Sequence, residues 1–229
     1  MTTIEAYDYS VTRSAGGTAT FQQEHRGHLN ILRKDILRTW NLLTGGKLKR
    51  TIGCFRSPGV HAVVALRFGQ WLKDRHILTR ILLTPLYLYL HHRVVTKWGI
   101  DLSRTARIGE GCYIGHFGGI IVGGDAEIGR DVSLSQGVTI GVWGRGAKSG
   151  SPIIGNNVYI APGAKVFGKI RVGNNVKIGA NAVVYKDVPD NAVCALYPGF
   201  TIISEAREPT FEVNPMHSGT CVSGREILT

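Results

Sequence analysis

The sequence IIGNNVYIAPGAKVFGKIRVGNNVKIGANAVV, residues 153–184, decides the fold of this protein. Within it, aliphatic residues recur at every sixth position: Ile154, Ile160, Val166, Val172, Ile178 and Val184. Small or polar residues, often Gly or Asn, follow these positions. Such a period is typical of a parallel β-helix, in which short strands stack in successive coils and bury a shared core. The sequence therefore predicts a mainly β protein built as a parallel β-helix.

The same register continues toward the N-terminus through two earlier blocks. Its aliphatic positions there are Leu102, Ile108, Ile114, Val122, Ile128, Leu134 and Ile140. The step before Val122 is eight residues long instead of six, and the insertion contains His116. The step before Ile154 is fourteen residues long, which predicts an inserted loop over 142–153. Because solenoids accommodate insertions as surface excursions that often carry function, we look for chemistry at both breaks.

Residues 29–99 are expected to form an α-helical lead-in to the β-helix. Apolar residues recur at helical spacing over Leu29–Leu43, again after Pro58, and over Leu78–Trp98. The last segment is strongly apolar, but its uncharged run extends only over residues 81–90. A membrane-spanning helix needs about 20 mostly apolar residues. We therefore expect this helix to be buried against the second helix or against a partner subunit.

The remaining parts of the chain carry weaker signals. Residues 1–28 are rich in Thr, Ser, Gly and Gln, which predicts a flexible N-terminus. The β-helix domain is expected over 100–200, and residues 201–229 are expected to form an irregular tail. The first residues do not resemble a secretory signal, and the four cysteines form no Cys-x-x-Cys pair. These features favour a cytoplasmic protein.

The formal charge of +11 is concentrated in the first part of the chain. Residues 1–100 contain 15 Lys or Arg and 5 Asp or Glu, whereas residues 101–229 contain 12 and 11. One interpretation is a solvated basic surface. The other is attraction to an anionic partner, such as peripheral contact with the inner face of a membrane. Nucleic acid is not an expected partner, because the basic residues form no short tract and no binding motif accompanies them.

Several segments share one resemblance: Asp101–Gly109, His116–Val122, Gln136–Gly141 and Ile178–Val184. Together with the predicted helices from Pro58 to Trp98, they resemble the catalytic domain and helical lead-in of the serine acetyltransferase family. That family belongs to the left-handed β-helix acyltransferases. The resemblance implies a left-handed coil, an acetyl-CoA-dependent O-acetyltransferase activity without a metal, and a homotrimer with active sites at subunit interfaces.

Acetyl transfer from a thioester to a hydroxyl needs a base that takes the hydroxyl proton as the oxygen attacks. An imidazole suits this role, and His116 is the only histidine between Asp101 and Gly199. The resemblance places the family's catalytic histidine on His116 and its orienting aspartate on Asp101. The competing structural interpretations are a surface histidine in a kink and a carboxylate that caps the junction between helix and solenoid.

The resemblance also implies that acetyl-CoA lies between neighbouring subunits, against the later coils. Carried over by position, the residues that contact it are Thr139, Gly141, Pro162, Gly179, Ala180 and Lys186. Arg145, Lys148 and Lys165 are further candidates for binding its phosphates. Each of these residues can equally be a turn residue or a solvated charge.

The sequence departs from the family at positions that hold the acceptor. Serine acetyltransferases carry Asp before the catalytic histidine, where this chain has Gly115, and an Arg-His pair near the end of the inserted loop, where it has Gly150–Ser151. Specificity for a charged ligand needs fixed counter-charges. We therefore expect a neutral acceptor beside Gly115 and Ser151, with Trp143 stacking on a sugar ring. These departures resemble the colanic-acid and capsule O-acetyltransferase branch.

We accordingly expect acetylation of a sugar hydroxyl in exopolysaccharide or capsule assembly, on a glycan or small-molecule acceptor. The first alternative is O-acetylation of L-serine in cysteine synthesis, and the second is a non-catalytic hexapeptide scaffold. A metal enzyme of the carbonic-anhydrase kind needs three His ligands, whereas the solenoid contains one. The sequence leaves open the acceptor, its hydroxyl, and the choice between a trimer and a dimer of trimers.

Overall fold

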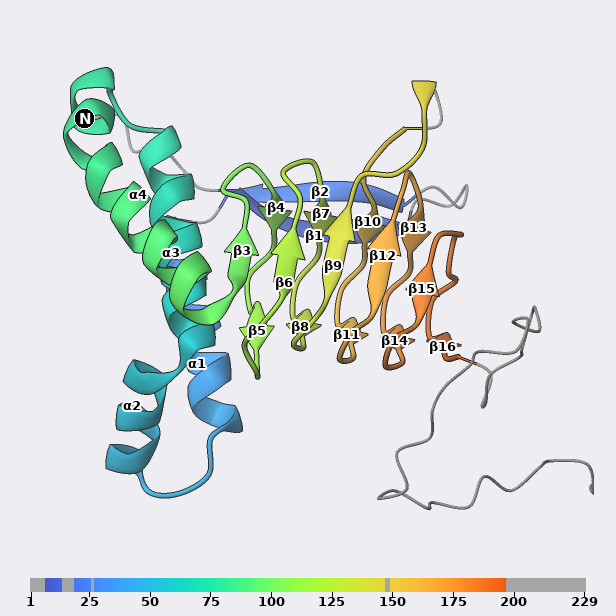
Figure 1. The fold of residues 1–229 in the computed structure, drawn as a ribbon, viewed down its shortest axis with the longest axis horizontal. Helices are drawn as coiled ribbons and strands as arrows, with labels where there is room; N and C mark the ends of the chain where they lie inside the picture. The colour runs from blue at the N-terminus through green and yellow to red at the C-terminus, as the bar shows by residue number, and fades with distance from the viewer. Residues whose placement is uncertain (1–6, 14–18, 26, 147–148, 197–229) are drawn as a thin grey trace, which may run out of the picture. The chain divides into compact units, whose positions relative to one another are not determined.

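The structure is a computed structural model that describes residues 7–13, 19–25, 27–146 and 149–196. Figure 1 shows helices followed by a stack of short strands. The strands form three parallel sheets, numbered I to III here. Sheet I contains β3 (Ile100–Leu102), β6 (Ile120–Val122), β9 (Thr139–Gly141), β12 (Lys165–Phe167) and β15 (Val183–Val184). Sheet II contains β4 (Arg107–Ile108), β7 (Glu127–Ile128), β10 (Ile153–Ile154) and β13 (Arg171–Val172). Sheet III contains β5 (Tyr113–Ile114), β8 (Ser133–Leu134), β11 (Tyr159–Ile160), β14 (Lys177–Ile178) and β16 (Val193–Cys194).

The register predicted from the sequence is the register of these sheets, so the predicted fold class is confirmed. In sheet I, Leu102 pairs with Val122 and Val122 with Ile140, and the column continues through Val166 to Val184. The corresponding columns of sheets II and III face the same interior, and their aliphatic side chains are almost completely buried. Because each buried aliphatic side chain stabilises a fold by roughly 1.5–3 kcal/mol, the columns hold the coils together.

Figure 1 also shows the hand of the coil. The chain runs up sheet I, which faces the viewer, crosses to sheet II at the back and returns through sheet III while it advances from left to right. This turn is left-handed, opposite to the usual crossover between parallel strands. The left hand implied by the family resemblance is therefore confirmed.

Asparagines hold the corner between sheets II and III. Asn157 and Asn175 have left-handed backbones, with φ of 54° and 56°, a conformation that Asn adopts more readily than most residues. The Asn157 side-chain amide donates to Asn175 Oδ1 at 3.0 Å, and the Asn175 amide donates to Asn191 Oδ1 at 2.9 Å. This ladder links successive coils and explains why Asn recurs in the repeat.

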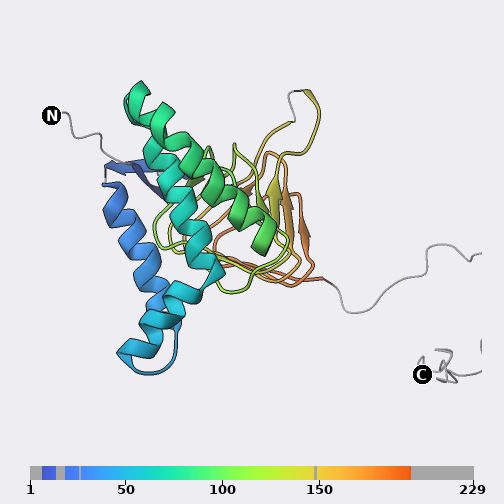
Figure 2. The ribbon, with the colours of Figure 1, turned by 60° about the vertical axis from the view of Figure 1, so that its left-hand side comes forward.

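The lead-in consists, within the described residues, of α1 (His28–Leu42), α2 (Lys47–Arg56), α3 (Pro58–Lys73) and α4 (Ile77–Trp98). The sequence analysis predicts α1, α3 and α4 but misses α2, a ten-residue helix in which only Cys54 is buried. Pro58 begins α3, and Gly99, in the left-handed conformation, ends α4. In Figure 2, α1 and α4 pack on either side of α3 at the start of the β-helix.

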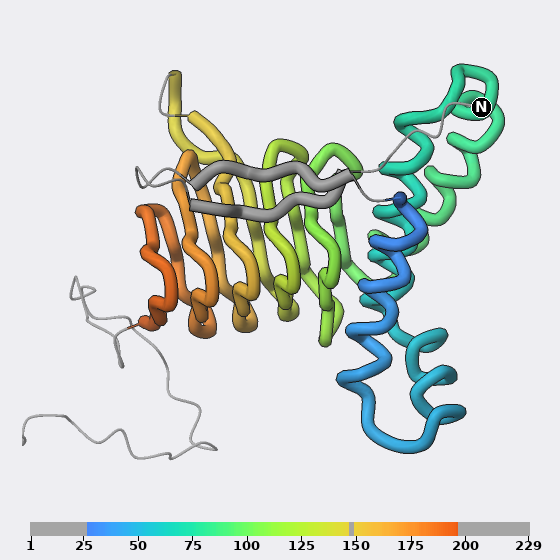
Figure 3. The backbone as a smooth tube through the Cα atoms, turned by 180° about the vertical axis from the view of Figure 1, so that it is seen from behind, coloured from blue at the N-terminus to red at the C-terminus, as the bar shows by residue number. Residues whose placement is uncertain are grey.

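Arg67 of α3 closes the end of the β-helix, where no earlier coil is present. Its guanidinium donates to the carbonyl oxygens of Ile108 and Gly109, both at 2.7 Å, which would otherwise be buried without partners. It also pairs with Asp35 of α1 at 2.8 Å, and Asp35 Oδ1 accepts a hydrogen bond from the Cys112 backbone N–H. Burial raises the pKa of Asp35, although the charge of Arg67 opposes this shift. Polar contacts thus fix α1 beside the first coils (Figure 3).

The apolar helix predicted to be buried is only partly so. In α4 only Tyr87 and Val94 are fully buried, whereas Leu78 and Leu82 are 70% and 76% exposed. The reason is that α4 packs on α3 along one side, and the apolar residues of its other side have no neighbouring element in the described chain. None of the described helices is long and apolar enough to cross a membrane.

The segment expected to be flexible contains a hairpin in the structure. β1 (Tyr7–Arg13) and β2 (Ala19–His25) pair in antiparallel fashion, with Tyr7 opposite His25. The mobility of residues 1–28 stays a prediction. The expected tail at 201–229 lies outside the described residues.

Candidate functional site

The outer face of sheet I gathers residues from many coils. Because side chains alternate along a strand, the residues beside the buried column point outward: Asp101, Ile121, Thr139, Lys165 and Val183. Ile121 and Val183 are about half exposed, at 49% and 53%. The register therefore brings Asp101 and Thr139, two of the candidate site residues, onto one face.

Two corners of the β-helix border this face. At the corner where sheet III leads into sheet I lie the turns that contain His116, Pro162, Gly179 and Ala180. These turns are stacked, since the backbone N–H of Asn181 donates to the Pro162 carbonyl at 2.9 Å. At the corner where sheet I leads into sheet II lie Gly141, Trp143, Ser151 and Lys186. The predicted catalytic and cofactor residues thus surround a single face. Their order in the sequence does not reveal this arrangement.

His116 and Asp101 lie on adjacent coils but do not make the hydrogen bond expected between them. Gly99, which precedes β3, lies against the turn that follows His116, because a Cβ on Gly99 would be 3.1 Å from the Gly119 nitrogen. His116 is exposed and has no hydrogen bond or ion pair with the residues that the structure describes. Asp101 instead lies beside His91 of α4, with 3.6 Å between Asp101 Oδ1 and His91 Nε2. The catalytic pairing therefore stays a prediction.

His91 is a site residue that the sequence reasoning missed. It stacks on Tyr87 at a ring distance of 5.6 Å, and the Arg104 guanidinium lies 5.1 Å from the Tyr87 ring centre. Together with Asp101 these side chains line a hollow of about 460 Å³ beside sheet I. Tyr87 and His91 are four residues apart on an apolar helix, a spacing that places them on one side. This helical spacing is the sequence signal that could have identified His91.

Thr139 and Lys165 contact each other on the outer face. The Lys165 ammonium donates to Thr139 Oγ1 at 3.1 Å and also to the Gly137 carbonyl oxygen. Lys165 is thus held against the outer face of sheet I by two acceptors, which argues against its role as a phosphate partner. Because Thr139 Oγ1 accepts from Lys165, its own O–H is directed away and can donate to a ligand. Arg145 is exposed, and Lys148 lies outside the described residues.

The inserted loop leaves sheet I as a short two-stranded excursion. Trp143 and Gly150 exchange backbone hydrogen bonds of 3.1 and 3.2 Å. The Trp143 ring is 60% exposed and meets Tyr185 edge to face at 6.2 Å. At the end of the loop, the Ser151 hydroxyl is buried and has no hydrogen-bond partner among the residues described. Such a hydroxyl is satisfied most simply by a ligand or by a neighbouring subunit.

The position before His116, where the family carries Asp, is closely approached by Tyr113. A Cβ at Gly115 would lie 3.2 Å from the ring and hydroxyl of Tyr113. Tyr113 is itself held by the Arg38 guanidinium, 5.9 Å from its ring centre. The tyrosine therefore occupies the space that a side chain at Gly115 needs.

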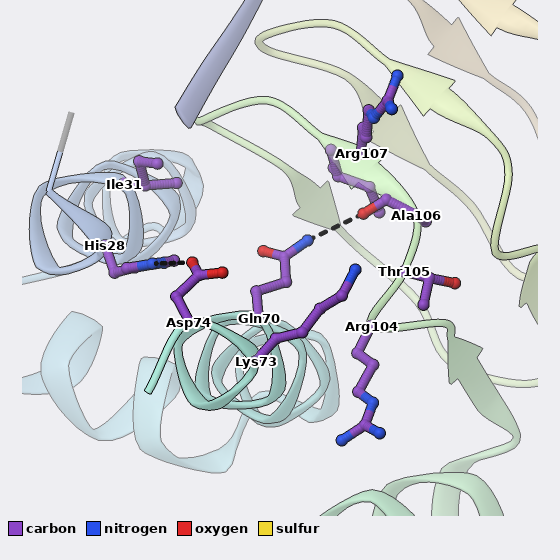
Figure 4. A pocket seen from close by; sticks show the side chains of 10 residues that line it. His28, Ile31, Gln70, Lys73, Asp74, Arg104, Thr105, Ala106 and Arg107 are labelled. Atoms are coloured by element: carbon purple, nitrogen blue, oxygen red, sulfur yellow. Dashed lines mark hydrogen bonds and ion pairs between the residues drawn. The ribbon is translucent and has the colours of Figure 1, made fainter. Parts of the chain in front are cut away.

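A second hollow lies between α1, α3 and the first turn of the β-helix, and it shares Arg104 and Thr105 with the hollow beside sheet I (Figure 4). His28 Nε2 lies 3.1 Å from Asp74 Oδ2, and Gln70 donates to the Ala106 carbonyl at 3.0 Å. Burial lowers the pKa of His28, although Asp74 opposes this shift. Two of its lining side chains thus bond each other, and a third bonds the backbone of the first turn. Among the described residues, no group of three or more His, Cys, Asp or Glu can hold a metal.

Comparisons with known proteins agree on one family. Residues 151–186 match the family model described as bacterial transferase hexapeptide (six repeats). The chain is 40% identical over 148 residues to serine acetyltransferase of Mycobacterium tuberculosis, covering 65% of this chain and 62% of that protein. It is 41% identical over 132 residues to serine acetyltransferase of Helicobacter pylori, covering 58% of this chain and 74% of that protein. The crystal structure of Brucella abortus serine acetyltransferase in complex with coenzyme A is 30% identical, with a TM-score of 0.62, covering 74% of this chain and 65% of that chain.

These findings correct the expected acceptor. The relatives are named serine acetyltransferases, so the assignment to the colanic-acid and capsule branch has no support and the sugar-hydroxyl reading is wrong. The inference rested on Gly115, Ser151, Trp143 and the short lead-in, and it did not include His91 and Arg104, which line a hollow together with Asp101. The chain spans about six-tenths of the M. tuberculosis relative, at 62% of its length. With three-quarters of the H. pylori protein covered at 41% identity, this chain belongs to the serine acetyltransferase family of hexapeptide-repeat proteins.

Proposed function

We propose that this chain is an acetyl-CoA-dependent O-acetyltransferase whose acceptor is L-serine. The observation that carries the acceptor is the hollow beside sheet I, which is lined by both the Arg104 guanidinium and the Asp101 carboxylate. L-Serine carries a carboxylate and an ammonium group, so it needs counter-charges of both signs in one place. His91 and the hydroxyls of Ser103 and Thr105 line the same hollow and add hydrogen-bonding groups. The names of the relatives support the same acceptor.

The chemistry assigns one proton transfer to His116. Its imidazole takes the proton from the serine hydroxyl as that oxygen attacks the thioester carbonyl of acetyl-CoA, and a tetrahedral intermediate forms. When the C–S bond breaks, the imidazolium returns the proton to the departing sulfur, and the products are O-acetylserine and CoA. The exposure of His116 and its lack of a partner among the described residues leave the ring accessible for this role.

Asp101 has a positioning role in this proposal. A carboxylate beside the base fixes its tautomer and stabilises the imidazolium that forms. Asp101 lies on the coil next to His116, and His91 stands 3.6 Å from one of its oxygens. In this proposal the Asp101 side chain turns toward His116, whose turn lies on the adjacent coil.

Acetyl-CoA is proposed to lie along the outer face of sheet I. The half-exposed apolar side chains of Ile121 and Val183 suit the aliphatic arm of the cofactor, and the Thr139 O–H suits an amide oxygen. Gly141 and Lys186 border one edge, while Pro162, Gly179 and Ala180 border the other. The B. abortus relative was crystallised with coenzyme A. We propose a homotrimer in which a neighbouring subunit covers this exposed face. Light scattering tests the trimer by measuring the mass of the assembly.

The test is the rate of CoA release from acetyl-CoA with purified full-length chain and a set of acceptors. L-Serine should be turned over, whereas ethanolamine, which lacks the carboxylate, and 3-hydroxypropionate, which lacks the ammonium group, should be turned over poorly. Arg104→Gln should raise the KM for L-serine with little change in kcat. Equal rates with L-serine and ethanolamine would show that the carboxylate is not recognised. No release with any acceptor would overturn the enzymatic assignment itself.

A further inference from the structure

We propose that the exposed side of α4 docks on an anionic membrane surface. This inference does not rest on the acetyl-transfer proposal, because it concerns the exposed side of α4, although Leu88 also lines the hollow beside sheet I. The apolar face of α4 is defined by Leu78, Ile81, Leu82, Leu88 and Tyr89, which are 55% to 76% exposed. Their spacing of three, four and seven residues places them along one side of the helix. The face is therefore a continuous apolar stripe and not a scatter of single residues.

An exposed stripe of this kind requires a partner. Soluble proteins seldom leave large contiguous apolar patches in water, and such patches mark protein or membrane contacts. Within the described chain, α4 packs against α3 and the start of the β-helix with its other side. Figure 1 shows that the end of α4 that begins at Ile77 lies away from the strands. The described part of the β-helix therefore leaves the stripe uncovered.

The charges around the stripe decide between membrane and self-association. Residues 28–98 contain 13 Lys or Arg and only two acidic residues, Asp35 and Asp74. Asp35 is buried against Arg67, and Asp74 bonds His28, so both are occupied. A two-fold contact between copies would bring the same basic surface against itself. Anionic lipid headgroups instead attract each basic residue near the surface, so charge complementarity favours a membrane.

The helix has the features of an interfacial helix, which lies on a bilayer without crossing it. Arg93 lies next to the stripe, Arg80 lies on the same helix, and α4 contains no acidic residue. Arg93 donates to the Tyr89 hydroxyl at 3.3 Å, so the ring can enter the headgroup region while its polar end stays hydrated. None of the described helices meets the length and hydropathy needed to span a membrane, which agrees with docking on its surface.

Vesicle sedimentation with the full chain tests this inference. The wild type should pellet with vesicles of phosphatidylcholine and phosphatidylglycerol, pellet much less with phosphatidylcholine alone, and be released by added salt. Leu78→Glu with Leu82→Glu should lower binding to the anionic vesicles by roughly a hundredfold or more, because two leucines no longer enter the bilayer. Arg80→Gln with Arg93→Gln should lower it by roughly tenfold to thirtyfold.

The matched control adds the same two negative charges on another helix. Leu48→Glu with Ile52→Glu changes exposed apolar residues of α2, and it should reduce binding far less than the α4 pair. Circular dichroism establishes that each variant is folded, and light scattering gives its mass. Absence of wild-type binding to anionic vesicles, or equal losses in the two double variants, would overturn the inference. A wild-type oligomer that dissociates in Leu78→Glu with Leu82→Glu, without vesicle binding, would assign the stripe to a second copy instead.

Discussion

The β-helix and the helical lead-in use their apolar residues in opposite ways. In the β-helix, aliphatic columns such as Ile128 and Ile154 are completely buried. In the lead-in, Leu82 and Phe55 are each 76% exposed, and the helices are anchored to the first coil by the polar contacts of Arg67. The difference teaches that a repeat completes its own core, whereas the lead-in leaves large apolar side chains exposed.

The largest expected effect compares the catalytic contributions of one histidine from each region. His116→Ala, on the β-helix, should lower turnover by about two to four orders of magnitude, the usual contribution of a general base. His91→Ala, on α4, leaves that base in place and should lower turnover less. Initial rates of CoA release with L-serine measure both effects, and thermal unfolding of the two variants provides the control. A larger loss in His91→Ala than in His116→Ala would move the base to the lead-in.

The next prediction removes a contact that connects the helical lead-in to the β-helix. Asp35→Ala should lower the free energy of unfolding by about 3–5 kcal/mol, because Arg67 would keep a buried charge without its partner. Asp74→Ala is the matched control, since Asp74 is partly exposed and its pairing with His28 should contribute at most about 1 kcal/mol. Urea unfolding followed by circular dichroism measures both. Equal losses in the two variants would mean that the buried pair does not anchor the helices.

A smaller effect tests the close stacking of the coils. A Cβ at Gly155 would lie 2.7 Å from the backbone carbonyl of Gly173, whereas a Cβ at Gly123 would meet its nearest atom at 3.4 Å. Gly155→Ala should therefore destabilise the fold by about 1–3 kcal/mol, the range for overpacked sites, and Gly123→Ala should be nearly neutral. Both residues follow a strand, so they are comparable. Urea unfolding that gives the same stability for both variants would contradict the stacking argument.

The smallest effect compares thiols at the two ends of the β-helix. Burial raises the pKa of Cys112 to about 12, and burial also raises the pKa of the less buried Cys194. Cys112 should resist a thiol reagent in the native state and react only on unfolding, whereas Cys194 should react earlier. Peptide mass spectrometry after timed labelling measures the order. Because the unfolded thiol ionises near pH 9.0 and the folded one near 12, the free energy of unfolding should also fall as pH rises through this interval. Faster labelling of Cys112 than of Cys194 would show that the first coil opens where α1 packs on it.

Local patterns predicted more of the fold than of the site. The six-residue spacing from Leu102 to Val184 anticipated the three buried columns, because each coil contributes one inward aliphatic residue per sheet. α2 was missed although Leu48, Ile52 and Phe55 recur at helical spacing in it, because the helix is short and these residues lie between two glycine and proline signals at Gly45–Gly46 and Pro58. His116 and Asp101 were singled out by residue type and resemblance, yet their pairing is not made in the structure, and Asp101 lies beside His91.

By itself, the sequence determined the β-helix, its register, its two insertions and the basic charge of the lead-in, because these depend on spacing and composition along the chain. Only the tertiary structure decided what lies across the coils and helices. It placed Lys165 on Thr139, Arg104 over the Tyr87 ring, and the apolar side of α4 in solvent. The physical reason is that such contacts join residues distant in sequence, whose approach is set by the packing of α3 and α4 on the first coil and leaves no period in the chain.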